Sequence, residues 1–332
     1  MSERAEPFRP AWWLRSAHLQ TLWPSLSRRA PEVGLERERL ELPDGDFLDL
    51  DWTPGTAGPL VLVLHGLEGS SRSRYARGLL AAVRRRGWQG VVMHFRGCSG
   101  EPNRLPRSYH SGETGDLSRV VGVVLRRFPG RSLAVVGYSL GGNVLLKWLG
   151  ETGANNPITC AVAVSVPFEL DAAARRLTHG FSRFYQWWLL RSLRENVARK
   201  VALGILSEEF TARAAAPDFW TFDDRVTATL HGFAGADDYY GRSSCRQYLG
   251  GVRIPTLVVH ARDDPFLFAD AIPAPTEVGS AVTLEVHERG GHVGFVAGRW
   301  PWRPDYWLER RIPAFLETWL VRAEPLPPRG RQ

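Results

Sequence analysis

The chain has 332 residues, of which 44% are hydrophobic and 23% are charged, and these values are ordinary for a folded globular protein. Its length suits one large domain with an insertion, or two domains. The basic residues are nearly all arginine, and the net charge of +7 is modest for this length. No basic stripe interleaved with stacking aromatics is present, so we expect no nucleic-acid partner.

Cysteine usage and the amino terminus indicate a compartment. Cys98, Cys160 and Cys245 are widely spaced and odd in number, which favours a reducing compartment over a disulfide framework. The first residues carry acids and a proline instead of the apolar core of a signal peptide, and no apolar run approaches the roughly 20 residues of a membrane span. We expect a cytoplasmic protein without a transmembrane segment. Peripheral attraction to anionic lipid and the oligomeric state stay open.

The order of apolar and polar segments predicts the architecture. Residues 1–30 combine polar and aromatic side chains, which is typical of an arm packed on the body. Segments 36–42 and 47–52 flank a turn and predict a hairpin. The further predicted strands are 60–64, 90–95, 133–136, 158–166, 256–260 and 282–287, and the predicted helices are 75–86, 116–128 and 309–322. This alternation predicts an α/β fold with a mostly parallel sheet covered by helices on both faces.

One long segment interrupts the alternation. Residues 169–250 are helix-like and rich in large aromatics, and an insertion there would lie over the carboxyl ends of the strands as a helical cap or lid. We expect its aromatics to pack inside the cap's own core, namely Phe181, Phe184, Tyr185, Trp187 and Trp188. The predicted organisation is a single domain made of the arm 1–30, the core 31–168 and 251–322, the cap 169–250 and a polar tail 323–332.

Ser139 carries the strongest chemical signal in the sequence. Gly137 and Gly141 flank it in a G-x-S-x-G pattern that follows a predicted strand and precedes an amphipathic helix. A serine at such a sharp turn has a strained backbone, and side chains two residues before and after it would collide with neighbouring backbone. The pattern therefore predicts a nucleophilic serine at the start of a helix.

A serine hydroxyl needs a base, and the base needs a third group to orient it. His292 follows Gly290 and a second glycine after a predicted strand, so we expect it to be the base. His287 lies within that strand and is expected to be structural. Asp263 and Asp264 follow the preceding strand and compete as the acid. The position before the Pro265 turn favours Asp264, while Asp237 and Asp238 fall in the insertion and are weaker candidates.

Two backbone amides are candidates for an oxyanion hole. One belongs to Leu140, directly after the serine, and the other to Leu67, in the glycine-containing loop after strand 60–64. His65 precedes that loop and is expected to order it through a hydrogen bond. The nine histidines and three cysteines show no zinc-type spacing, and no phosphate-binding or dinucleotide fingerprint occurs. We expect neither a metal nor a cofactor.

Taken together, these motifs resemble the α/β-hydrolase family, and within it the YheT-like group related to the mammalian ABHD1 and ABHD3 proteins. The matching segments are 18–21, 65–70, 95–100, 109–114, 137–143, 263–266 and 290–294. The resemblance implies a serine esterase acting on a small-molecule ester, acyl-lipid or short-chain, with Ser139, Asp264 and His292 as the triad. An acyltransferase using the same residues, or a non-catalytic ligand-binding protein of this fold, are the alternative interpretations.

Overall fold

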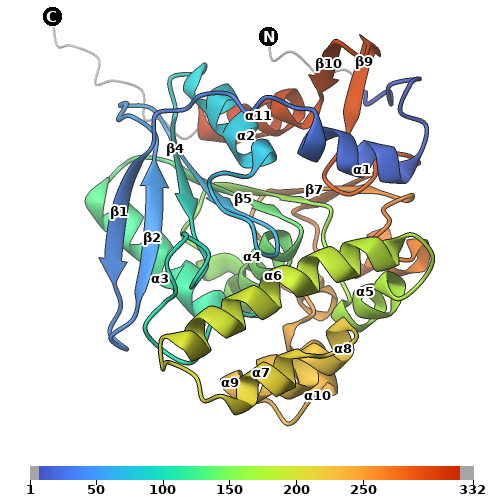
Figure 1. The fold of residues 1–332 in the computed structure, drawn as a ribbon. Coiled ribbons are helices and arrows are strands. Elements are labelled where there is room, and N and C mark those ends of the chain that lie inside the picture. Colours follow the sequence, from blue (N-terminus) through green and yellow to red (C-terminus); the bar gives the residue numbers. More distant parts are fainter. Residues whose placement is uncertain (1–6, 322–332) are drawn as a thin grey trace, which may run out of the picture.

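The computed structural model describes residues 7–321, and its centre is an eight-stranded sheet in the order β1-β2-β4-β3-β5-β6-β7-β8 (Figure 1). The strands are β1 (Glu36–Glu41), β2 (Phe47–Trp52), β3 (Leu60–Leu64), β4 (Gln89–Met93), β5 (Leu133–Tyr138), β6 (Cys160–Val164), β7 (Thr256–Ala261) and β8 (Val282–His287). The hairpin β1–β2 and the pair β2–β4 are antiparallel, and the pairs from β4 to β8 are parallel. This topology confirms the predicted fold class.

Helices cover both faces of the sheet. They are α2 (Arg74–Arg84), α3 (Thr114–Arg127), α4 (Leu140–Thr152) and α11 (Leu308–Leu320). Within β3, Val61 and Val63 pack with α2 and α11, whereas the alternate leucines pack with α3 and α4. A strand buried on both faces must be apolar throughout, which is why β3 reads as a continuous apolar run.

Two further elements of the structure lie where no helix or strand was predicted. The arm contains helix α1 (Ala17–Leu26), and the hairpin β9 (Val296–Trp300) and β10 (Arg303–Tyr306) follows β8. The buried Gln20 side chain joins them, because its Nε2 donates to the carbonyl of Val296 at 3.0 Å and its Oε1 accepts from the Val296 amide at 2.7 Å. The predicted polar tail lies outside the described residues.

The segment between β6 and β7 forms the cap helices, which Figure 1 shows gathered at one end of the sheet. They are α5 (Leu170–Leu177), α6 (Ser182–Ala202), α7 (Glu209–Ala214), α8 (Phe219–Phe222), α9 (Thr229–His231) and α10 (Ala236–Ser243), with a π-helical stretch at Asp223–Ala228. Short 3₁₀ turns lie at Gly153–Asn155, Arg246–Gly251, Ala269–Ala271 and Pro275–Glu277. Of residues 7–321, no helix is both long and apolar enough to cross a bilayer.

The expectation that the cap aromatics pack inside is wrong for four of the five. Tyr185 is buried, but Phe181, Phe184, Trp187 and Trp188 are exposed by 41 to 56%. Helix α6 turns Tyr185 and the leucines that follow it toward α5 and α7, so the aromatic side chains on its other faces point outward.

Candidate active site

Ser139 lies at the turn between β5 and α4. Its backbone has φ 52° and ψ −120°, a conformation that side chains rarely adopt. A Cβ on Gly137 would lie 2.7 Å from the carbonyl carbon of Gly141, and a Cβ on Gly141 would lie 2.6 Å from the carbonyl oxygen of His65. Both flanking glycines are therefore required by close backbone approach, which holds the hydroxyl at the tip of the turn.

His292 meets Ser139 from the loop after β8. Its Nε2 lies 2.9 Å from the Ser139 Oγ. Two hydroxyl groups fix this loop, because the His292 amide donates to Thr21 Oγ1 and the Val293 amide donates to Ser165 Oγ, each at 2.9 Å. Thr21 belongs to α1, so the arm of the chain helps to aim the imidazole.

Asp264 completes the hydrogen-bonded chain. Its Oδ2 lies 2.8 Å and its Oδ1 3.1 Å from His292 Nδ1, and Oδ1 also accepts from the Phe266 amide at 2.8 Å. Burial opposes ionisation of this carboxyl, but the neighbouring His292 and its hydrogen bond outweigh burial and hold the pKa of Asp264 below its ordinary value. The Phe266 ring stacks on the imidazole with centroids 3.9 Å apart.

The structure separates the two competing aspartates. Asp263 turns away from the imidazole and accepts a hydrogen bond from the Gly291 amide at 2.9 Å, and burial raises its pKa. Asp264 is the carboxylate at His292. The other candidates lie elsewhere. Asp237 accepts a hydrogen bond from the indole of Trp220 on the cap, and the His287 ring, on the edge strand β8, packs between the rings of Phe8 and Trp307.

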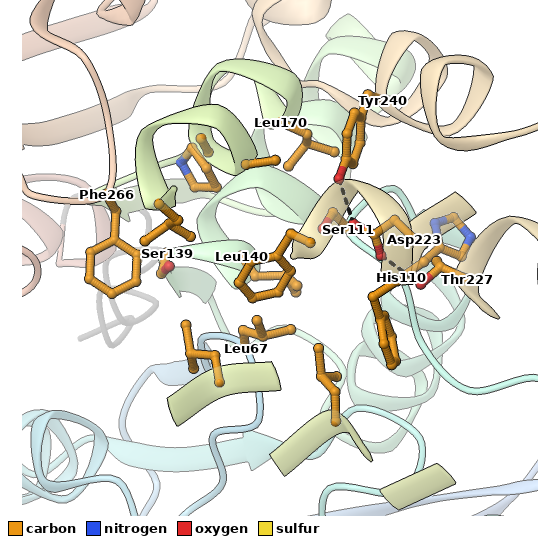
Figure 2. Close-up of a pocket in the computed structure, with 18 of the residues that line it drawn as sticks. Leu67, His110, Ser111, Ser139, Leu140, Leu170, Asp223, Thr227, Tyr240 and Phe266 are labelled. Carbon is orange, nitrogen blue, oxygen red and sulfur yellow. Dashed lines mark hydrogen bonds between the residues drawn. The ribbon is translucent and has the colours of Figure 1, made fainter. Parts of the chain in front are cut away.

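Leu67 and Leu140 line the same cavity as the serine (Figure 2). Among the described residues, neither backbone amide donates to a protein acceptor. A Cβ at Gly66 would come within 3.3 Å of the Ser139 Cβ, so glycine lets this loop approach the site. His65 orders the loop as expected: its Nε2 accepts from the Phe95 amide at 3.1 Å, so its Nδ1 donates to the Gly66 carbonyl at 2.7 Å. Burial lowers the pKa of His65 to about 3, so the ring is neutral.

A cavity extends from Ser139 beneath the cap and is walled mainly by apolar side chains. Those walls include Leu67 and Leu140 from the core and Leu170, Ala174, Leu189, Leu193, Phe219 and Phe222 from the cap. Figure 2 shows a polar cluster away from the serine, where Tyr240 and Thr227 donate to the Asp223 carboxylate at 2.8 and 2.6 Å. Burial raises the pKa of Asp223 to about 6.

Sequence reasoning missed Asp223 and Phe266. Asp223 lies in the π-helical stretch of the cap, and only the fold turns it toward the cavity. Phe266 ends the segment 263–266 that carries part of the family resemblance, and its short spacing from the acid was a signal that could have given it a role. In residues 7–321, no three metal-binding side chains cluster in a way that could hold a metal ion.

Comparison with known proteins identifies the family of the chain. Residues 59–298 match the alpha/beta hydrolase fold family. The chain is 46% identical over 94% of both chains to "Putative esterase YheT" of Escherichia coli, and 29% identical over 97% of this chain and 80% of the relative to mouse "Phospholipase ABHD3". A yeast "Monoacylglycerol lipase" is 31% identical over 77% of this chain and 58% of that protein.

The fold also matches solved structures. A Pyrococcus furiosus esterase superposes with a TM-score of 0.57 over 87% of this chain and 92% of that one, at 17% identity. Relatives of esterase and lipase type support hydrolase activity for this protein. The chain belongs to the α/β-hydrolase family, and within that family it is YheT-like.

Proposed function

We propose that this protein is a serine hydrolase that cleaves carboxylic esters through an acyl-enzyme. The observation that carries the proposal is the unbroken chain of hydrogen bonds from Asp264 through His292 to Ser139, at the mouth of an apolar cavity. A hydroxyl bonded to an imidazole, itself bonded to a buried carboxylate, is the arrangement that activates serine for acyl transfer.

The first half-reaction forms the acyl-enzyme. His292 Nε2 accepts the Ser139 hydroxyl proton as Oγ attacks the ester carbonyl carbon. Asp264 stabilises the imidazolium that forms. The Leu67 and Leu140 amides, which have no protein acceptor within residues 7–321, donate to the oxyanion; each such donor is worth about 3 kcal/mol of barrier. When the tetrahedral intermediate collapses, the C–O bond breaks and His292 returns the proton to the leaving alcohol.

The second half-reaction regenerates the enzyme. Water gives a proton to His292 and attacks the acyl carbonyl, and the carboxylic acid leaves as Ser139 Oγ recovers its proton. The cavity is lined mainly by apolar side chains, which favours apolar acyl groups. The relatives named as a phospholipase and a monoacylglycerol lipase support a lipid-like ester as the substrate class.

The test is hydrolysis of p-nitrophenyl esters from acetate to octanoate by the unmodified protein and by Ser139→Ala. We expect the rate to rise with acyl length while the chain fits the cavity, and the alanine variant to fall to background with an unchanged melting temperature. Unchanged hydrolysis by Ser139→Ala would show that Ser139 is not the nucleophile. Transfer of the acyl group to an added alcohol in preference to water would identify an acyltransferase instead.

A further inference from the structure

An exposed apolar surface lies where α1 approaches the start of α6. We call it the α1–α6 patch and define it by Leu19, Leu26, Phe181, Phe184, Trp187 and Trp188. Leu26 is 72% exposed, Trp188 56% and Trp187 50%. The ring of His18 on α1 lies 4.6 Å from that of Phe181, directly before α6, and 5.8 Å from that of Tyr185 on α6, so the two helices adjoin at this surface. Exposed aromatics gathered in this way mark an interaction surface.

The patch surrounds the mouth of an open groove between α1 and α6. The groove is walled by Leu22 and Leu26 of α1 and by Phe184 and Trp188 of α6, and it reaches Ser139. The cavity beneath the cap begins at the same serine, and Leu67, Leu189, Phe266 and His292 line both spaces. A molecule that enters from the patch therefore meets the serine first and the apolar cavity next.

Positive charge accompanies the apolar side chains. Arg72 and Arg74 line the groove, and Arg183 lies one helical turn before Trp187 on α6. Within residues 7–321, none of these three arginines pairs with a carboxylate. Guanidinium groups beside exposed tryptophan and phenylalanine match a surface that offers anionic headgroups above an apolar layer.

We propose that the α1–α6 patch docks on a membrane that carries anionic phospholipid. The tryptophan, phenylalanine and leucine side chains enter the headgroup–acyl boundary while the arginines meet the phosphates. The charge complementarity favours this occupant over a second copy of the chain, whose patch would carry the same positive charge. Docking in this orientation sets the groove mouth on the lipid, so that a membrane ester reaches Ser139 without crossing water; this consequence rests on the proposed function, but docking itself does not.

The test measures association with vesicles by flotation, using Ser139→Ala protein so that no lipid is consumed. One set of vesicles contains phosphatidylcholine alone and the other contains phosphatidylcholine with phosphatidylglycerol. Leu19→Gln with Trp187→Gln removes two patch side chains that are not walls of the groove. Trp319→Gln is the matched control, because Trp319 is 38% exposed on α11, away from α6 in Figure 1.

We expect the parent protein and the Trp319 control to float with the anionic vesicles, and the double variant to bind them about tenfold more weakly. Neutral vesicles should bind the parent at least about fivefold more weakly for each arginine engaged. Equal binding by the double variant, or no binding by the parent, would overturn the proposal. A dimer that dissociates in the double variant, without vesicle binding, would assign the patch to a second copy.

The result is independent of the hydrolase proposal. In the Ser139-containing background, the double variant should hydrolyse a soluble p-nitrophenyl ester at the unmodified rate, which also shows that it is folded. If neither the unmodified protein nor the double variant hydrolysed the ester, the proposed function would be refuted, but the flotation result would still apply. Failure to float would remove only the docking surface.

Discussion

Replacing Asp264 by asparagine tests how the site controls the tautomer of His292. The carboxylate Oδ1 accepts from the Phe266 amide at 2.8 Å, and Oδ2 faces the imidazole Nδ1 at 2.8 Å. In Asp264→Asn the amide oxygen keeps the Phe266 hydrogen bond, so the NH2 group faces Nδ1. Nδ1 must then be the acceptor and Nε2 carries the proton. A protonated Nε2 cannot take the proton of Ser139.

The expected loss in kcat is about 10⁴-fold, or about 5.5 kcal/mol at roughly 1.36 kcal/mol for each factor of ten. Asp263→Asn is the matched control, since its amide oxygen can still accept from Gly291, and we expect its kcat to fall less than about tenfold. The assay is steady-state hydrolysis of p-nitrophenyl butyrate, with melting temperatures to show that both variants fold. Near-normal turnover by Asp264→Asn, or an equal loss in Asp263→Asn, would show that the Asp264 carboxylate does not set the tautomer of His292.

Three further predictions concern stability. Gly137→Ala should lower the free energy of unfolding by about 3 kcal/mol, or prevent folding, because its Cβ meets backbone. Gly122→Ala on α3 is the control in urea unfolding: its Cβ meets only a flexible arginine, so it should be neutral or stabilising. The folded pKa of Asp223, about 6, exceeds the ordinary 3.8, so this carboxyl weakens folding as pH rises through about 6. Asp223→Asn should therefore raise the free energy of unfolding by up to about 3 kcal/mol above about pH 7, with a higher melting temperature, and should change both little near pH 4; an effect confined to acid would contradict the assignment. Arg96 pairs with the buried carboxylates of Asp46 and Asp116 at 3.0 and 2.8 Å. Arg96→Met removes this cation and should cost about 3 to 5 kcal/mol in the same unfolding assay, with unchanged turnover per folded molecule; a loss below about 1 kcal/mol would show that these ion pairs contribute little.

The order of apolar and polar segments along the sequence was enough to predict the sheet, and to predict that Ser139, Asp264 and His292 lie close together. Strands buried on both faces must be apolar, and their carboxyl ends meet at one edge, so Ser139, Asp264 and His292 could be expected to converge. Even the choice of Asp264 over Asp263 followed from turn chemistry, because the residue before Pro265 begins the turn. These inferences depend on backbone constraints that act over a few residues.

The elements that escaped prediction depend on contacts between distant parts of the chain. Helix α1 is held by the buried Gln20 against Val296 in β9, a pairing that no local periodicity reveals. The aromatics of α6 were expected inside the cap because such side chains usually pack in cores. Which face of α6 meets the cap core is set by α5 and α7, and the sequence of α6 alone does not encode it. The domain limits proposed from the sequence stay a prediction.

Covalent labelling shows whether Ser139 is the nucleophile. The protein is treated with a fluorophosphonate, digested and analysed by mass spectrometry, with Ser139→Ala and Asp264→Asn beside it. We expect a single adduct on the peptide that contains Ser139, no adduct in the alanine variant and much slower labelling in the asparagine variant. Folded protein that takes no label at this serine, or that labels equally fast without the Asp264 carboxylate, would show that Ser139 is not activated by this triad.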